Sequence, residues 1–192
     1  MPPFLLGPGP FGPEPPNGLV SLLGSIGDLG TFSFHATKNI TSGEGGALLV
    51  NNSELGEKAE VYREKGTDRA SFLRGEVDKY TWREVGSSFL PSELTAGFLL
   101  SQLEQGEFIT DQRMGIWERY HEGLLRLEMR ERITRPVIPP FCKHNAHMYY
   151  VLLNPSLNRR KIIEELRVKA GVEVSSHYVP LHSSPGGRRY GR

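Results

Sequence analysis

The sequence predicts an α/β fold, because segments with the pattern of strands alternate with segments whose apolar residues recur at helical spacing. The strand-like segments are residues 31–35, 47–50, 147–153 and 172–179, and the helix-like segments are 53–65, 92–105, 108–127 and 159–170. A chain of 192 residues is also long enough to bury a sizeable core. These observations together indicate a globular protein of the mixed class.

The N-terminal region changes character near residue 18. Residues 1–18 are rich in proline and glycine, which neither continue a helix nor complete a sheet ladder, so we expect an extended or disordered arm. In the strand predicted at 31–35, Phe32 and Phe34 share one face and polar side chains share the other. The apolar run 47–50 predicts a second, buried strand, and a glycine-rich loop separates the two.

Helices and a long loop follow these strands. Ser53 is a suitable N-cap for the helix predicted over 53–65, which a glycine ends. The polar stretch 66–88 predicts a loop of a length that is uncommon unless it serves a function or an interface. Apolar spacing then predicts helices at 92–105 and 108–127, the second of them long and amphipathic.

The C-terminal part alternates strand, helix and strand after a proline-rich break. Residues 147–153 predict a strand, 159–170 a helix ended by Gly171, and 172–179 another strand. This order indicates a small α/β unit. The final residues, from Gly186 onward, are mostly glycine and arginine, and nothing in the pattern is expected to order them.

Charge and cysteine content exclude several classes of partner. Lys and Arg total 23 against 22 Asp and Glu, so the net charge of +1 gives no attraction for nucleic acid or a membrane surface. The single cysteine, Cys142, cannot form an internal disulfide. The start has neither a basic region nor a long apolar run, and no stretch approaches the length of a membrane span. We therefore expect a cytoplasmic protein.

Lys38 is the residue best suited to covalent chemistry. It follows a predicted strand at the mouth of a turn, among hydroxyl and imidazole side chains, and the first carboxylate after it is Glu44. Burial would lower its pKa from about 10.4 and expose the lone pair that Schiff-base chemistry needs. Clustered hydroxyls and the amides of a glycine-rich turn would also suit a phosphate group. The alternative is an ordinary exposed loop lysine.

Other candidate residues have less specific patterns. The run 43–46 lacks the spacing of a dinucleotide or nucleotide-phosphate loop, so it is either a flexible hairpin loop or a ligand loop. His177 and His182 flank the end of the last predicted strand, where they are either substrate-loop residues or surface histidines. We expect no metal site, because the paired spacing of zinc ligands is missing from Cys142, His144 and His147.

Residues 29–39, which read Leu-Gly-Thr-Phe-Ser-Phe-His-Ala-Thr-Lys-Asn, are followed by Gly-Glu-Gly-Gly-Ala at 43–47. This segment resembles the pyridoxal-phosphate lysine region of the DegT-type sugar-nucleotide aminotransferases. The resemblance extends over about residues 24–190. It continues through the motifs at residues 63–67, 77–83, 86–88, 145–148 and 177–182.

The resemblance implies part of the type I aminotransferase fold and pyridoxal 5'-phosphate as the cofactor. It implies that Lys38 carries the cofactor as a Schiff base and later moves a proton between substrate carbon and cofactor. Ser33 would hold the cofactor phosphate, and Ser88 would reach the phosphate of a neighbouring subunit in a homodimer. His177 and Tyr178 match a motif near the sugar-nucleotide site.

The resemblance also implies a reaction and a division of the chain. The reaction is transamination of a dTDP-4-keto-6-deoxyhexose with glutamate as donor, in the biosynthesis of a cell-surface polysaccharide such as enterobacterial common antigen. Residues 19–105 would be the remainder of the cofactor-binding large domain, and residues 106–192 a long helix with a truncated small domain.

Several motifs of the family have no counterpart in the chain. A family member is about twice as long, and the Gly-Ser/Thr phosphate loop, the stacking aromatic residue and the Asp that pairs with the pyridine nitrogen are absent. Without that Asp the ring loses its electron sink, so we expect the isolated chain to be impaired. The alternative is a noncatalytic remnant that binds a complementary subunit through residues 92–127.

Overall fold

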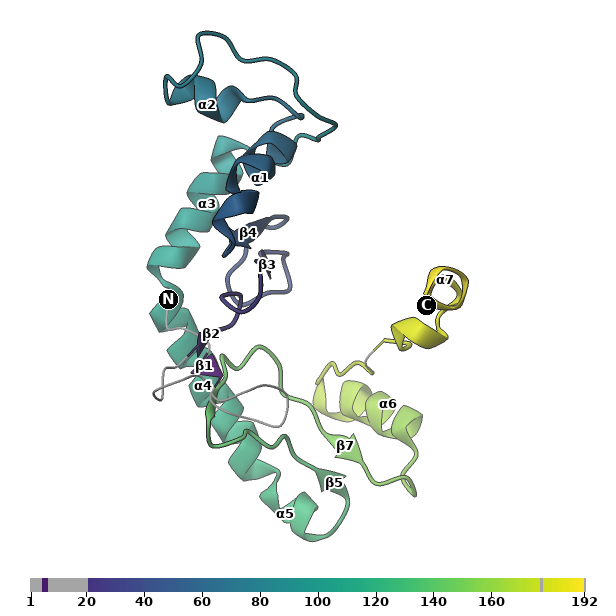
Figure 1. Ribbon diagram of the computed structural model, residues 1–192. Helices are drawn as coiled ribbons and strands as arrows, with labels where there is room; N and C mark the ends of the chain where they lie inside the picture. The colour runs from purple at the N-terminus through teal and green to yellow at the C-terminus, as the bar shows by residue number, and fades with distance from the viewer. Residues whose placement is uncertain (1–4, 7–20, 177, 192) are drawn as a thin grey trace. The chain divides into compact units, whose positions relative to one another are not determined.

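The computed structural model describes residues 5–6, 21–176 and 178–191 (Figure 1). The chain divides into two compact units. Unit 1 comprises Met1–Leu124 and Pro136–Tyr150, and unit 2 comprises Leu125–Arg135 and Val151–Arg192. The expectation about residues 1–18 falls outside the described residues except at Leu5–Leu6, and the predicted domain boundaries stay a prediction.

A β-hairpin carries the predicted lysine region of unit 1. Strands β3 (Leu29–Ser33) and β4 (Gly46–Val50) pair antiparallel, from Leu29 opposite Val50 to Ser33 opposite Gly46. The second strand is confirmed in position, but the expectation that it is buried is wrong, because its residues are exposed or half-buried. The first strand ends at Ser33, two residues short of the expected end at His35. Phe34, the next residue, is buried, and its N–H and C=O bond to Gly45 O and Ser42 N–H rather than to a regular ladder. Elsewhere in unit 1, β1 (Leu5–Leu6) pairs with β2 (Ser21–Leu22) and with β6 (Cys142–Lys143).

The segment after the hairpin is helical, with a different cap from the expected one. A 3-10 turn, η2 (Ser53–Leu55), leads into α1 (Gly56–Arg63). The cap is Asn52 rather than Ser53, because the Asn52 side chain accepts a hydrogen bond from the Glu54 N–H. The expected long loop follows, but it contains a short helix, α2 (Arg69–Leu73).

The two long helices of unit 1 lie one after the other along the chain. Ser92 is the N-cap of α3 (Glu93–Glu104), as the sequence predicts. The helix expected over 108–127 is two helices, α4 (Gly106–Gly123) and α5 (Leu125–Met129), and the second belongs to unit 2. The break follows Gly123, and glycine is a poor helix former because it loses more backbone entropy than other residues.

Unit 2 is built on a short strand pair and one well-capped helix. Strands β5 (Ile133–Thr134) and β7 (Leu152–Leu153) pair antiparallel. Helix α6 (Arg159–Ala170) has both predicted ends, with an N-cap at Asn158 and Gly171 in the left-handed conformation at φ 63°. The sequence expectations fail at three places in this part of the chain. Of the strand expected at 147–153, only residues 152–153 form a strand, and the described residues of 172–179 form none. The C-terminal end, for which no order was expected, forms η3 (Leu181–Ser183) and α7 (Pro185–Tyr190).

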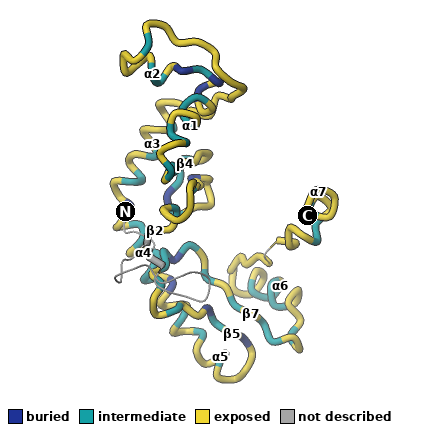
Figure 2. The backbone as a smooth tube through the Cα atoms, viewed as in Figure 1, coloured by how far each residue is buried: buried dark blue, intermediate teal, exposed yellow. Residues whose placement is uncertain are grey.

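Few of the described residues are buried, as Figure 2 shows, and many large hydrophobic residues are exposed. The buried hydrophobic residues described in unit 1 come from the segment after β3, from α4 and from the segment after β6. In the described part of unit 2, the buried hydrophobic residue is Ile133. Those of unit 1 are Phe34, Ile40, Trp117 and Ala146. On the hairpin, Leu29, Phe32 and Leu48 remain exposed, because a two-stranded sheet covers neither of its own faces.

Candidate functional site

The candidate site is the tight turn that follows β3. Lys38 N–H donates to His35 O at 2.9 Å, which closes the turn on which the lysine lies. Ser33 ends β3, and its Oγ accepts from His35 N–H at 3.4 Å. Lys38 therefore lies on the turn, and Ser33 lies two residues before the turn at the end of β3. Both residues are exposed.

His35 connects this turn to the glycine-rich loop. Its Nδ1 accepts from Thr37 N–H at 3.2 Å and lies 2.9 Å from Thr37 Oγ1. This pattern assigns the ring hydrogen to Nε2, which faces Glu44 Oε1 at 3.5 Å. The carboxylate of Glu44 is thus directed at an imidazole N–H of the same turn.

The glycine-rich loop is held by short-range hydrogen bonds. Phe34 N–H donates to Gly45 O, and Ser42 N–H donates to Phe34 O, each at 2.8 Å. Thr41 Oγ1 accepts from Gly43 N–H at 2.9 Å. Gly43 and Gly45 have φ values of 82° and 158°, which glycine adopts without the strain that a Cβ brings. The loop is an ordered connection between β3 and β4.

A second layer of contacts joins the lysine turn to helix α4 and to residues 144–147. Asn39 Nδ2 donates to Asn145 O at 2.7 Å, and His147 Nδ1 lies 3.0 Å from Asn39 Oδ1. Arg113 of α4 donates to Ala146 O and His147 O at 3.2 and 2.6 Å. Burial is the main cause that lowers the pKa of the His147 imidazole, and the charges of Lys38 and Arg113 add to it.

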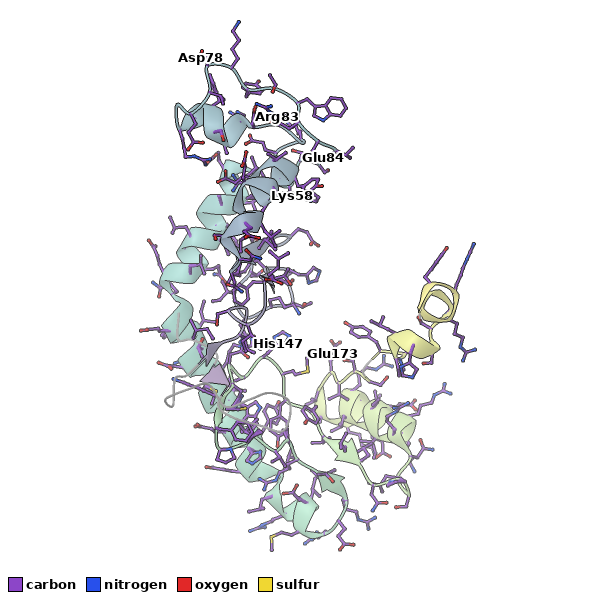
Figure 3. All side chains as sticks on the ribbon, in the orientation of Figure 1. Lys58, Asp78, Arg83, Glu84, His147 and Glu173 are labelled. Carbon is purple, nitrogen blue, oxygen red and sulfur yellow. The ribbon has the colours of Figure 1, made fainter. Side chains whose placement is uncertain are left out.

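Sequence reasoning missed this second layer. It considered His147 (labelled in Figure 3) as a poor metal ligand and as part of the motif at 145–148, it considered Asn39 only as a neighbour of Lys38 in sequence, and it did not consider Arg113. The described residues contain no group of three or more side chains suited to a metal ion. The one available signal was the resemblance of the motif at 145–148, which carries no information about its partners.

Ser88 lies on a different loop from Lys38 and Ser33. It is exposed and forms an antiparallel bridge with Glu64, at the point where the loop after α1 returns. Gly66 is required near this bridge, because a Cβ there would meet Glu84 O at 1.6 Å. Arg83 and Glu84 donate their N–H groups to Gly66 O at 2.7 and 3.0 Å.

Asp68 organises the loop that leads to Ser88. Asp68 is buried and accepts from Thr81 N–H at 2.6 Å and from Arg83 Nε at 2.5 Å. The hydrogen bond from Thr81, followed by that from Arg83, lowers the pKa of the Asp68 carboxyl. Asp78, Arg83 and Glu84 all lie on the part of this loop that follows α2 (Figure 3).

The remaining predicted site residues are in unit 2. His177 lies outside the described residues, and Tyr178 is exposed. In the described part of the chain, no helix combines the length and the apolar character needed to cross a bilayer.

The chemistry that the described site offers is a primary amine, from Lys38, and a hydroxyl, from Ser33, at the end of a hairpin and beside a glycine-rich loop.

Residues 20–190 match the DegT/DnrJ/EryC1/StrS aminotransferase family. The chain is 32% identical over 153 residues to UDP-4-amino-4,6-dideoxy-N-acetyl-beta-L-altrosamine transaminase of Helicobacter pylori, covering 79% of this chain and 38% of that protein. It is 32% identical over 168 residues to GDP-perosamine synthase of Caulobacter vibrioides, covering 84% of this chain and 42% of that protein.

The structure is similar to that of Helicobacter pylori PseC, an aminotransferase involved in the biosynthesis of pseudoaminic acid. The TM-score is 0.73 at 27% sequence identity, over 92% of this chain and 45% of that one. The predicted α/β class is confirmed, and the chain holds part of an aminotransferase fold. It spans less than half the length of each of these relatives.

Proposed function

We propose that this chain, which belongs to the DegT/DnrJ/EryC1/StrS aminotransferase family, carries the lysine side of the pyridoxal 5'-phosphate site of a sugar-nucleotide aminotransferase. The observation that supports the proposal is the short segment from the end of β3 to the following turn, in which Ser33 Oγ accepts from His35 N–H and Lys38 N–H donates to His35 O. An amine that is neutral can bind an aldehyde covalently, and a hydroxyl at a strand end can donate to a phosphate.

The residues of the turn fit the cofactor in these two contacts. Lys38 would hold it covalently, and Ser33 would donate to its phosphate, helped by N–H groups of the glycine-rich loop. When bound, pyridoxal phosphate supplies an electron sink for the carbanion that transamination requires. Lys38 Nζ would take up a proton from the substrate carbon and deliver it to the cofactor during amino transfer.

The chain places its nearby carboxylates poorly for the pyridine nitrogen. Asp28 precedes β3 and lies about 17 Å along the strand from Ser33, at about 3.4 Å per residue. Glu44 is at the correct end of the hairpin, but it faces His35 Nε2. We therefore propose that a carboxylate from outside these 192 residues pairs with the ring, and that the chain alone has weak cofactor affinity and negligible turnover.

The proposed substrates are a dTDP-4-keto-6-deoxyhexose and glutamate, as for a dTDP-4-amino-4,6-dideoxygalactose transaminase in cell-surface polysaccharide synthesis. Support comes from the resemblance of the motifs and from the relative that is named as a transaminase of a 4-amino-4,6-dideoxy sugar. His177 and Tyr178 are proposed sugar-nucleotide contacts, and Ser88 a phosphate contact across a homodimer. The reaction is proposed for the cytoplasm.

Reductive trapping tests the role of Lys38. The chain is incubated with pyridoxal 5'-phosphate, reduced with borohydride and mapped by mass spectrometry. We expect the label at Lys38 and its loss in both Lys38→Ala and Lys38→Arg, because arginine keeps the charge but cannot form the imine. Lys169→Arg is the control, since Lys169 lies in unit 2 and pairs with Glu165 at 3.3 Å. Labelling mainly at another lysine contradicts the proposal.

A second candidate function is a noncatalytic module that binds a complementary or full-length subunit. The observation in its favour is the apolar surface on α3, where the side chains of Leu94 and Phe98 are 88% and 53% exposed. Co-purification with a full-length relative distinguishes the two functions. A complex that forms without any label at Lys38 favours the module, whereas labelling at Lys38 favours the enzyme.

A further inference from the structure

Three consecutive backbone carbonyls, at residues 145, 146 and 147, are bound by side chains instead of by a strand or helix. Asn39 donates from Nδ2 to Asn145 O at 2.7 Å. Arg113 donates from Nε to Ala146 O and from Nη2 to His147 O, at 3.2 and 2.6 Å. All of these residues belong to unit 1. Of these three carbonyls, only that of His147 lies within the strand expected at 147–153, and its bond to Arg113 makes it less available to a ladder.

The segment held in this way has a constrained backbone. Ala146 is buried and has a φ of 51°, in the left-handed region that residues with a Cβ rarely adopt. Its N–H donates to His144 Nδ1, and the His147 N–H donates to Asn145 Oδ1, each at 3.1 Å. A conformation of this kind persists only where the surroundings over-determine it.

The Asn39 side chain also sets the tautomer of His147. Its Nδ2 is the donor to Asn145 O, so its Oδ1 is the acceptor that faces His147 Nδ1 at 3.0 Å. Nδ1 therefore carries the ring hydrogen, and Nε2 carries the lone pair. Burial and the charges of Lys38 and Arg113 disfavour the protonated imidazole, which is consistent with this neutral form.

We propose that Asn39, Arg113 and His147 form a clamp that positions Lys38. Asn39 follows Lys38 directly in the chain, so the contacts of its amide restrain the same turn that the Lys38 N–H closes on His35 O. Ile40, the next residue, is buried and anchors the turn on its far side. The exposed amine then samples fewer directions. The role of Lys38 rests on the proposed function, whereas the clamp is a property of the chain without cofactor.

Hydrogen exchange of the full chain tests the clamp without any cofactor. Mass spectrometry follows peptides that cover residues 36–42 and 144–148. We expect Asn39→Ala to accelerate exchange in both by roughly tenfold or more, because one side chain restrains both segments. Asn51→Ala is the matched control, since Asn51 Nδ2 also donates to two distant carbonyls, Gly24 O at 2.9 Å and Gly27 O at 3.0 Å. It should leave these two peptides within about twofold of the native chain.

The effect on Lys38 is measured by reductive trapping with pyridoxal 5'-phosphate, as the ratio of label at Lys38 to label at Lys169. We expect Asn39→Ala and Arg113→Ala each to lower this ratio by roughly fivefold, and Asn51→Ala to preserve it. Arg113→Lys should fail to rescue, because an ammonium lacks the planar fork that reaches two carbonyls. The double variant Asn39→Ala/Arg113→Ala should lower the labelling ratio no further than either single variant, because the two residues act as one unit.

Each result decides a separate point. Unchanged exchange in Asn39→Ala overturns the clamp, and faster exchange with an unchanged Lys38 ratio overturns its positioning role. A native chain without label at Lys38 contradicts the proposed function, while the exchange measurement still decides on the clamp. If Asn39→Ala does not fold, Asn39→Asp replaces it, because the carboxylate keeps the acceptor for His147 Nδ1 and loses the donor to Asn145 O.

Discussion

His144 and His147 are two imidazoles whose surroundings favour the neutral form. Burial is the largest cause that lowers the pKa of both side chains. At His144 the carboxylate of Glu118 opposes this effect and the imidazole of His121 reinforces it. At His147 the reinforcing charges are those of Lys38 and Arg113. Protonation of either ring therefore costs more in the folded chain than in the unfolded one.

The stability of the folded chain should accordingly fall as the pH drops below 6.5. Unfolded histidines titrate near 6.5 and folded ones at lower pH, so the unfolded state binds more protons in this range. The contribution of His144 and His147 to the free energy of unfolding is fully present above pH 6.5 and is lost as the pH falls through their lower pKa values in the folded chain. Urea midpoints at about pH 7.5 and about pH 5.5 measure it. The double variant His144→Gln/His147→Gln should show a smaller drop, and an unchanged drop would refute this account.

Lys38 and Asn39 show how far sequence reasoning reaches at single residues. Lys38 could be predicted from the sequence because its motif is local, with Ser33 only five residues before it. The contact of Asn39 could not be predicted from the sequence, because its partner Asn145 is 106 residues away and no spacing rule connects them. A local pattern identifies the candidate reactive group, but the contacts around it depend on the tertiary fold.

At the scale of elements, the same distinction separates the helices from the short strands. Both ends of α6 were predictable, since Asn158 and Gly171 act within one turn of the helix. The strand expected at 147–153 forms only at Leu152–Leu153, where β5 supplies a neighbour to pair with, whereas the carbonyl of His147 is bound by Arg113. Strand prediction depends on partners that a local pattern does not reveal.

Trp117 anchors α4 to the segment after β6. It is buried, and its ring centroid lies 4.6, 4.5 and 5.2 Å from those of His121, His144 and Tyr149. We expect Trp117→Ala to reduce the free energy of unfolding by about 3–5 kcal/mol, the usual cost of removing a large buried side chain. Chemical unfolding followed by circular dichroism measures the loss. Tyr120→Ala, an exposed neighbour on α4, should cost much less, and equal costs would contradict the anchor role.

Asp68 should be the main restraint on the loop 64–88. Asp68→Asn removes the charge that holds Arg83 and weakens the bond from Thr81 N–H, so trypsin should cleave after Arg83 faster by roughly fivefold or more. Asp78→Asn, an exposed residue of the same loop, is the control and should leave the rate unchanged. Equal cleavage rates in the two variants would show that the carboxylate of Asp68 does not order the loop.

At the scale of the whole molecule, the described residues expose apolar surface that a complete domain would cover. The sheets have two or three strands within the described part of the chain, and Leu29, Phe32 and Leu48 of the hairpin are exposed. The relatives are more than twice as long as the aligned region. The sequence predicted the fold class, because the class follows from the pattern of strands and helices.

We therefore expect the 192-residue chain on its own to form oligomers or aggregates. Unpaired strand edges and exposed apolar faces favour association with other chains. Light scattering after size-exclusion chromatography measures the state, and Leu48→Lys, which adds a charge to an exposed site on β4, should reduce association. A monodisperse monomer that unfolds cooperatively would instead indicate an independent domain.

The central claim is that the chain holds the lysine side of a cofactor site whose ring-binding carboxylate comes from elsewhere. The most direct test is glutamate-dependent amino transfer to a dTDP-4-keto-6-deoxyhexose, measured for the chain alone and after co-expression with the part of a full-length relative that it does not cover. We predict negligible turnover alone and restored turnover in the complex, lost again with Lys38→Ala. Robust turnover by the chain alone would contradict the claim, because Glu44, Asp28 or another carboxylate of these 192 residues would then serve the ring.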